Sequence, residues 1–371
     1  MHVAATMIRF LRSARVPALA SALILAAASA RAGGYYKVTP VGSDNSLGSG
    51  INNSGQMVGS DRNPQGWGIP FLYDSRTGVT TYLNVRGGLG QAAAINDAGS
   101  IVGSTSPTLT AFLYRNGSFA YLDGAAVTAS SAAAINGSNA VVGEARRRSD
   151  GNIHAFRYQA GVVTDLGTLG GDYSGALGIN DAGQVVGYSR TASGPIRGFL
   201  YENGVMKILG TLGGDYSNAQ AINEAGDIAG GSTTASGDNH AFLDRQGVML
   251  DLGTLGGTYS FASGLNDAGQ VVGMSSVASG AYHGFVYSNG MMLDLNSLID
   301  PDSGWVIYSA NGINNSGQIV ANASRVGDPT FPLRAVLLTP TAVPEPSGLA
   351  LIAAGASGLA LAARRRRGGR A

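Results

Sequence analysis

The chain has 371 residues, with 57 glycines, no cysteine and a formal net charge of +1. The absence of cysteine excludes a disulfide-stabilised scaffold, while the many glycines favour short strands joined by tight turns. Residues 33–343 carry 15 Lys and Arg against 22 Asp and Glu, a balance of −7, which disfavours nucleic-acid binding because an acidic surface repels phosphate.

The first 32 residues are predicted to be a secretory signal peptide. A basic start is followed by an uncharged apolar stretch over residues 16–30, and the small-x-small pattern of a cleavage site occurs at Ala28-Ser29-Ala30 and Ala30-Arg31-Ala32. The basic residues are Arg9, Arg12 and Arg15. An uncleaved N-terminal anchor is the alternative. Either reading places the rest of the chain outside the cytoplasm.

Seven copies of one repeat occupy the middle of the chain. The pattern Ile-Asn-x-x-Gly-x-(Val/Ile)-(Val/Ala)-Gly recurs at intervals of 40 to 48 residues. The motif begins at Ile51, Ile95, Ile135, Ile179, Ile222, Leu265 and Ile313. The repeats that contain these seven motifs are numbered 1 to 7, and each repeat starts a few residues before its motif. Asn139 replaces a glycine in repeat 3, and Ala321 replaces the last glycine in repeat 7.

Each repeat is predicted to hold four short strands. In repeat 4 these cover residues 174–179, 184–188, 198–202 and 205–209. Between the first two strands, asparagine bonds its own backbone and glycine supplies a positive φ, which makes a tight hairpin turn. The turn asparagines are Asn52, Asn96, Asn136, Asn180, Asn223, Asn266 and Asn314.

The predicted fold is all-β, a seven-bladed β-propeller closed by the N-terminal strand, which completes the last blade. Four strands in about 44 residues form the unit of a propeller blade. Residues 35–41 occupy the place of a fourth strand, and repeat 7 stops after its third strand at Leu338. Pairing of these two segments would close a circle. A β-solenoid or a two-part β-array is the alternative.

The repeats resemble those of the HAF-repeat extracellular proteins. His-Ala-Phe stands at 154–156 and 240–242, and Leu-Gly-Thr-Leu-Gly-Gly recurs at 166–171, 209–214 and 252–257. The resemblance covers nearly all of a domain placed at residues 33–341. It implies an exported location and brings no established activity with it.

Repeated polar residues suggest possible sites that compete with structural roles. His154, His240 and His283 share one register and are interpreted as strand-end residues rather than metal ligands. Asp172 and Asp215 begin similar loops that could bind calcium, although stabilisation of the loop by Asp or Ser capping is the favoured explanation. The seven turn asparagines could form a polar ring around the axis, but the turn alone accounts for them. No catalytic, cofactor or metal residue is assigned, and calcium is the one ion considered.

Two insertions break the repeat. Arg146, Arg147, Arg148 and Asp150 form one in repeat 3, and the segment from Asp300 and Asp302 to Trp305 forms another before repeat 7. A glycoside hydrolase or lyase needs carboxylates that face each other across a sugar, and the second insertion is where they are expected. The near-identical repeats favour a scaffold over an enzyme.

The C-terminal 30 residues, 342–371, are predicted to be a sorting tail. Three parts follow one another: a Pro-Glu-Pro motif, an uncharged apolar stretch at 347–363 that is just long enough to cross a membrane, and an arginine cluster. The motif and cluster residues are Pro344, Glu345, Pro346, Arg364, Arg365, Arg366 and Arg367. This order resembles the PEP-CTERM signal of Gram-negative bacteria, which implies processing by an exosortase.

The predicted function is therefore that of an exported cell-surface or matrix-associated repeat protein. A non-catalytic binding scaffold is favoured, with extracellular polysaccharide or surface proteins as partners and a membrane contact through the tail before processing. Glycans are the ligand class that best suits its acidic surface. A carbohydrate-active enzyme on the same scaffold is the alternative.

Overall fold

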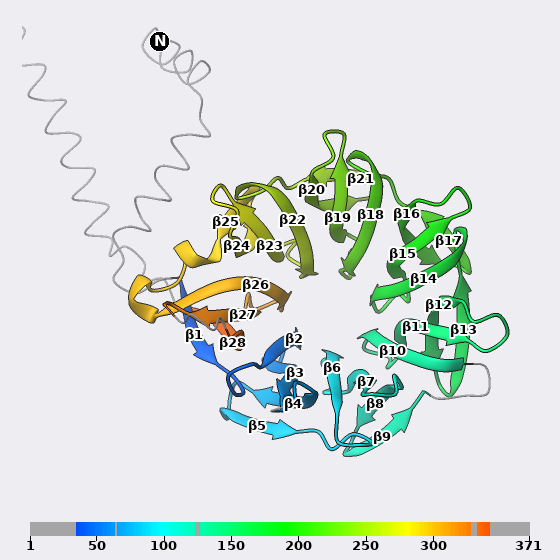
Figure 1. The fold of residues 1–371 in the computed structure, drawn as a ribbon, viewed down its shortest axis with the longest axis horizontal. Helices are drawn as coiled ribbons and strands as arrows, with labels where there is room; N and C mark the ends of the chain where they lie inside the picture. Colours follow the sequence, from blue (N-terminus) through cyan, green and yellow to red (C-terminus); the bar gives the residue numbers. More distant parts are fainter. Residues whose placement is uncertain (1–34, 64, 123–126, 328–331, 342–371) are drawn as a thin grey trace, which may run out of the picture.

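The computed structural model describes residues 35–63, 65–122, 127–327 and 332–341. The predicted signal peptide and sorting tail lie outside these residues. The described chain is all-β, with strands arranged around a central axis and two short 3₁₀ helices, η1 (Leu295–Ser297) and η2 (Pro301–Ser303) (Figure 1). In the described part of the chain, no helix is long and apolar enough to span a bilayer.

Successive antiparallel strands follow the sequence repeats. Repeats 1 and 2 form four-stranded sheets: β2 (Leu47–Ile51), β3 (Gln56–Arg62), β4 (Gly68–Asp74) and β5 (Val79–Tyr82), then β6 (Gly90–Ile95), β7 (Ile101–Thr105), β8 (Ala111–Arg115) and β9 (Ser118–Tyr121). Repeats 3 and 4 comprise β10 (Val127–Ile135), β11 (Val141–Arg147), β12 (Ile153–Gln159), β13 (Val162–Gly167), β14 (Gly170–Ile179), β15 (Val185–Thr191), β16 (Ile196–Glu202) and β17 (Val205–Ile208).

The last three repeats continue the pattern. Repeats 5 and 6 comprise β18 (Gly213–Ile222), β19 (Ile228–Thr234), β20 (Asn239–Arg245), β21 (Val248–Asp251), β22 (Gly256–Leu265), β23 (Val271–Val277), β24 (Tyr282–Ser288) and β25 (Met291–Asp294). Repeat 7 comprises β26 (Trp305–Ile313), β27 (Ile319–Arg325) and β28 (Arg334–Pro340). Single parallel contacts, Ile153 with Tyr173 and Asn239 with Tyr259, join repeats 3 to 4 and 5 to 6 into eight-stranded sheets.

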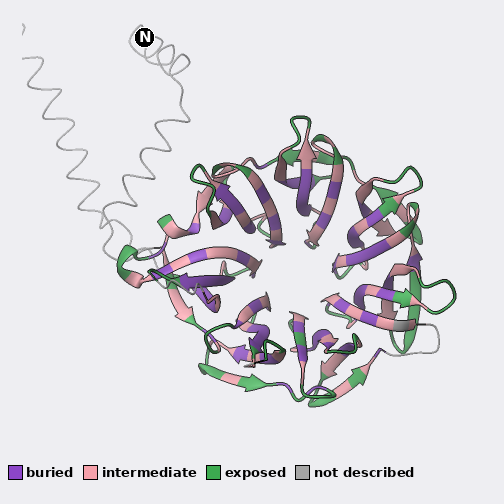
Figure 2. Ribbon diagram, in the orientation of Figure 1, coloured by how far each residue is buried: buried purple, intermediate pink, exposed green. Residues whose placement is uncertain are grey.

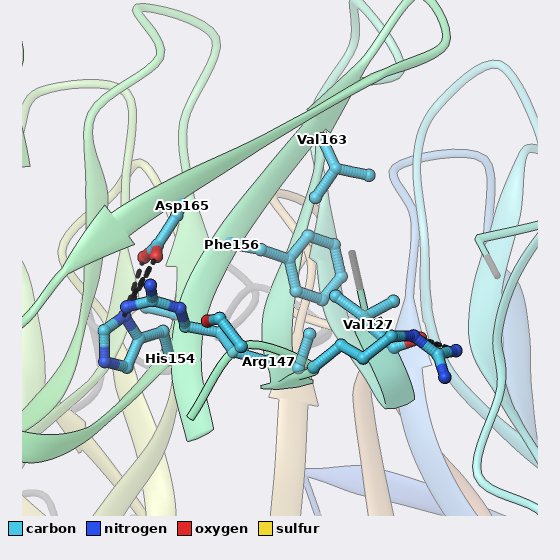
Figure 3. Close-up of a pocket in the computed structure, with 10 residues that line it drawn as sticks. Val127, Arg147, His154, Phe156, Val163 and Asp165 are labelled. Carbon is cyan, nitrogen blue, oxygen red and sulfur yellow. Dashed lines mark hydrogen bonds and ion pairs between the residues drawn. The ribbon is translucent and has the colours of Figure 1, made fainter. Parts of the chain in front are cut away.

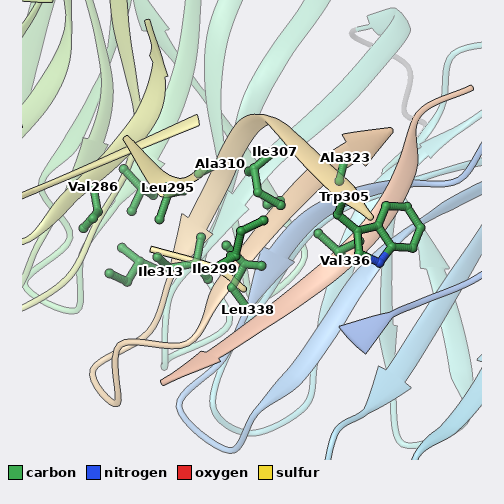
Figure 4. Close-up of a cluster of buried hydrophobic side chains, with 13 residues drawn as sticks. Val286, Leu295, Ile299, Trp305, Ile307, Ala310, Ile313, Ala323, Val336 and Leu338 are labelled. Carbon is green, nitrogen blue, oxygen red and sulfur yellow. The ribbon is translucent and has the colours of Figure 1, made fainter. Parts of the chain in front are cut away.

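The N-terminal strand β1 (Tyr36–Pro40) pairs antiparallel with β28, in the register Tyr36 to Pro340 through Pro40 to Val336. This confirms the predicted pairing of the two chain ends. Tyr36 and Val38 of β1 pack against a buried cluster that includes Ile307 and Leu338 (Figure 4). The outermost strand of the last sheet is therefore held by side chains as well as by its backbone ladder.

The last glycine of the repeat motif is required by a close backbone approach. At Gly187, a Cβ atom would overlap the carbonyl oxygen of Gly175 on the first strand of the sheet. The turn glycine has a different reason, since Gly183 has a φ of 79°. Asn139, which replaces that glycine in repeat 3, adopts a φ of 62°, a conformation that asparagine tolerates better than most residues.

The core lies between neighbouring sheets. A phenylalanine of the third strand is fully buried in five of the repeats, and Phe156 of repeat 3 is 3% exposed. These rings belong to apolar clusters that lie between successive repeats. The fully buried rings are Phe71, Phe112, Phe199, Phe242 and Phe285. Figure 2 shows that exposure concentrates on the outermost strands and on the turns. The innermost strands, which carry alanine, serine and glycine, are left to surround the axis.

Candidate functional site

A buried asparagine organises the first turn of every repeat. Asn180 Oδ1 accepts the backbone N–H of Gln184 at 3.0 Å, and the backbone N–H of Gly183 donates to the Asn180 carbonyl oxygen at 3.0 Å. The side chain thus replaces backbone partners that the turn leaves out. All seven predicted turn residues are in this position and are 1–6% exposed: Asn52, Asn96, Asn136, Asn180, Asn223, Asn266 and Asn314.

The same carboxamides link one repeat to the next. Each Nδ2 group donates to the backbone carbonyl oxygen of the next asparagine, over 2.9–3.2 Å. The seventh bond runs from Asn314 to Asn52, so the seven bonds form a closed cycle. The turn and the polar ring were treated as alternatives in the sequence analysis. Each asparagine serves both, with its Oδ1 atom in the turn and its Nδ2 group in the cycle. Aspartate could make only the turn, because it has no N–H to donate.

An exposed acidic rim borders this asparagine cycle. It consists of the residue that follows each asparagine, and its carboxylates are Asp97, Asp181, Glu224 and Asp267. The backbone N–H of Glu224 donates to Asp267 Oδ1 at 3.0 Å, and that of Asp181 donates to the Glu224 carboxylate at 3.1 Å. Partial burial, together with the charges of Asp181 and Asp267, raises the pKa of Glu224 above its usual value.

A cavity of about 500 Å³ lies on the axis between the innermost strands β2, β6, β10, β18, β22 and β26. Its lining residues stand three to five positions before the asparagines on these strands, with Ser104 and Asn322 added from second strands. Figure 1 shows the innermost strands of all repeats converging on this region. Every described residue that lines the cavity is uncharged.

Residues at the cavity differ from repeat to repeat. One residue of the first strand pairs with the residue that follows the last position of the repeat motif. This pair is different in every repeat: Leu47–Ser60, Gln91–Ser104, Ser131–Glu144, Gly175–Tyr188, Asn218–Gly231, Phe261–Met274 and Ser309–Asn322. The adjoining pair is alanine with glycine in five of the repeats. Variation is therefore concentrated at one level of the axis.

Several polar side chains of the cavity are available to a ligand. Gln91, Gln220 and Ser263 form no side-chain hydrogen bond to another described residue. Asn311 and Asn322, by contrast, hold Gly48 through bonds of 2.6 and 3.0 Å. The cavity therefore has a fixed wall at repeats 1 and 7, while repeats 2, 5 and 6 offer carboxamide and hydroxyl groups that bond no other described side chain.

Phe261 is the one aromatic side chain among the described cavity residues, and a glycine makes room for it. A Cβ atom at Gly231 in the neighbouring repeat would overlap the Phe261 ring. The other repeats have serine, glutamate, tyrosine, methionine or asparagine at the position of Gly231. The ring therefore depends on a local departure from the repeat.

Glu144 is the one carboxylate among the fourteen variable pair residues, and it is engaged by tyrosine. The Tyr188 hydroxyl donates to Glu144 Oε2 at 2.9 Å, and the Tyr173 hydroxyl donates to Tyr188 at 2.8 Å. Burial, with a further contribution from these neighbours, raises the pKa of Tyr188, so its hydroxyl stays protonated. These two hydrogen bonds connect Glu144 of repeat 3 to Tyr188 and Tyr173 of repeat 4.

The repeated histidines lie away from the axis and pair with aspartates that the sequence analysis did not assign. Nδ1 of His240 lies 2.9 Å from the Asp251 carboxylate, and the equivalent pairs are His154–Asp165 and His283–Asp294. Asp251 also accepts the Gly253 N–H at 2.8 Å. Repeat 4, which has Arg197 at the histidine position, has Ile208 at the aspartate position. The pair thus joins the third and fourth strands of a sheet.

The insertion before repeat 7 is used structurally. Asp300 caps η2 by accepting the Asp302 N–H at 2.9 Å, and Trp305 is 8% exposed within a core cluster. The Arg325 guanidinium stacks 3.9 Å from the Trp305 ring centre. Asp172, considered for calcium, pairs with Arg190 at 3.3 Å. Within the described ranges, no three His, Asp or Glu side chains gather as metal ligands.

Residues 342–367 match the family model of the PEP-CTERM protein-sorting motif. The chain carries a PEP-CTERM sorting motif. This motif marks an exported protein of the cell surface or envelope and implies processing by an exosortase-type enzyme. A comparison with curated proteins found no match.

Solved structures with distant similarity include TolB from Acinetobacter baumannii, at 12% identity and a TM-score of 0.40 over 82% of this chain and 80% of that one. A puromycin-hydrolyzing peptidase from Mycobacterium tuberculosis has 11% identity and a TM-score of 0.48 over 84% and 53%. Virginiamycin B lyase from Staphylococcus aureus has 13% identity and a TM-score of 0.40 over 82% and 99%. No activity is transferred from these proteins to this chain.

Proposed function

We propose that this exported surface protein is a non-catalytic scaffold that binds neutral glycans in its axial cavity. The supporting observation is the lining as far as it is described. It includes carboxamides and hydroxyls that bond no other described side chain, one aromatic ring and no charged side chain. Sugar hydroxyls both donate and accept hydrogen bonds, as do Gln91, Gln220 and Ser263, and a sugar's C–H face packs against an aromatic ring such as Phe261.

The scaffold itself is proposed to be a seven-bladed β-propeller with a closed ring. Two observations support this architecture: the pairing of β1 with β28, and the cycle of bonds that returns from Asn314 to Asn52. A closed ring gives the cavity a wall to which six of the seven repeats contribute described residues. Membership of the HAF-repeat class and a Gram-negative-type envelope are parts of the same proposal, carried by the repeat motifs and the tail.

The experiment is binding of the exported full chain to a glycan array and to matrix polysaccharide. Wild-type protein should bind a defined subset of neutral glycans, while Gln220→Ala and Phe261→Ala should each weaken binding at least tenfold, about 1.4 kcal/mol. Val248→Ala, on an outer strand where Val248 is 72% exposed, is the matched control. The proposal would be contradicted if the wild-type protein bound no glycan, or if both cavity variants bound glycan as tightly as the wild type.

A further inference from the structure

A second cavity, of about 530 Å³, opens on the outer part of repeat 3. Its floor is apolar, formed by Val127, Ala145, Phe156 and Val163. Figure 3 shows the Phe156 ring between Val163 and Val127, with Arg147 extending toward His154 and Asp165. The equivalent phenylalanines of repeats 4, 5 and 6 are fully buried against larger side chains.

Two large side chains fill this space in the following three repeats. A leucine from the linker and a methionine from the fourth strand belong to the same cluster as the phenylalanine: Leu169 and Met206 with Phe199, Leu212 and Met249 with Phe242, and Leu255 and Met292 with Phe285. In repeat 3, Val163 has the register position of the methionine.

The serine that holds this leucine is also replaced in repeat 3. The leucine N–H is held by a serine in each of the three regular repeats, as Leu169 N donates to Ser189 Oγ at 2.9 Å. Ala145 takes the place of that serine in repeat 3 and lines the cavity. Two described positions of repeat 3, Val163 and Ala145, therefore hold smaller side chains than the methionine and serine of the regular repeats, and both line the cavity.

Arginines stand at the mouth of this space. Arg147 and Arg148 occupy the register of Thr191-Ala192, Thr234-Ala235 and Val277-Ala278 in the regular repeats. Arg147 Nη1 lies 3.5 Å from the carboxylates of Asp150 and Asp165, and Arg148 Nη2 donates to the Val127 carbonyl oxygen at 3.2 Å. Partly exposed ion pairs such as those of Arg147 are weak, so the Arg147 guanidinium can turn to an incoming anion.

We propose that this cavity binds a small amphiphile, with its apolar chain over Phe156 and its anionic head at Arg147 and Arg148. The paired departures carry the inference, because the smaller residues create an apolar space and the arginines supply the complementary charge beside it. This site is distinct from the axial cavity and needs a different ligand.

Titration calorimetry of the exported full chain with octanoate, octyl sulfate, octanol and acetate tests the proposal. Octanoate or octyl sulfate should bind with one ligand per chain, at least tenfold more tightly than octanol, and acetate alone should show no binding. The stronger of the two anions identifies the head group as carboxylate or sulfate. Equal affinity for octanol and both anions, or no binding of either anion, would overturn the proposal.

Variants that restore the regular repeat separate the two parts of the site. Val163→Met should fill the cavity and lower the affinity for the preferred anion at least tenfold. Val248→Met, at an exposed position, should leave that affinity unchanged. Arg147→Thr combined with Arg148→Ala should abolish the preference for the anion over octanol. Because these residues already occur in neighbouring repeats, the variants should fold, which circular dichroism and thermal unfolding can verify. Unchanged affinity in both variants would overturn the assignment.

Discussion

The asparagine turns follow directly after the first strands, which carry the variable cavity pairs a few residues earlier. The two regions differ in how far their residues vary and in how completely their polar groups are bonded. The turns hold the same side chain seven times, buried and bonded in a closed cycle. The cavity pairs hold a different combination each time, and several of their polar groups have no partner among the described residues. Positions that maintain the ring are thus separated from positions that can give it specificity.

The largest effect on stability is expected when one hydrogen bond of the asparagine cycle is removed. Asn180→Asp keeps the turn acceptor but deletes the donor to Asn223 and buries a charge. We expect a loss of about 2–4 kcal/mol in the free energy of unfolding, because a buried partner is left without its bond. Denaturant unfolding of the full chain measures it. Asn203→Asp, in an exposed turn, should cost less than about 0.5 kcal/mol; equal losses would contradict the role of the cycle.

Substitution of the glycine beside Phe261 tests the other region. Gly231→Ser installs the residue of repeats 1 and 2 and should push the Phe261 ring out of place. Overpacking of this kind costs about 1–3 kcal/mol, and glycan affinity should fall at least tenfold. Gly210→Ser, at an exposed glycine with open space around it, is the control for both measurements. Unaltered glycan binding by Gly231→Ser would show that the ring takes no part.

The smallest effect is expected at the acidic rim. Because the pKa of Glu224 is raised in the folded protein, protonation favours folding, and stability attributable to this group increases as pH falls through its titration. Glu224→Gln should therefore be slightly more stable than wild type at neutral pH, with the advantage disappearing on acidification. Thermal unfolding of both proteins between pH 4 and 8 measures the difference. An advantage that grows toward low pH would contradict the sign.

The sequence alone predicts the repeat, its four strands, the turn chemistry and the pairing of β1 with β28, because each depends on local patterns or on the missing strand of repeat 7. The sequence could not show that the turn asparagines also form a cycle, because the cycle depends on the distance between neighbouring repeats, which the sequence does not contain. The cavity pairs depend on register, which the motif does not reveal. The His240–Asp251 pair did leave a signal: the two residue types occur together in repeats 3, 5 and 6 and are both missing in repeat 4.

A crystal structure of the protein with a neutral oligosaccharide chosen from the glycan array tests most directly whether the variable level of the axis binds sugar. We expect density for the oligosaccharide in the axial cavity, with a sugar ring against Phe261 and a hydrogen bond to Gln220. Density at the acidic rim or on the outer strands, with an empty axial cavity at saturating oligosaccharide, would contradict it.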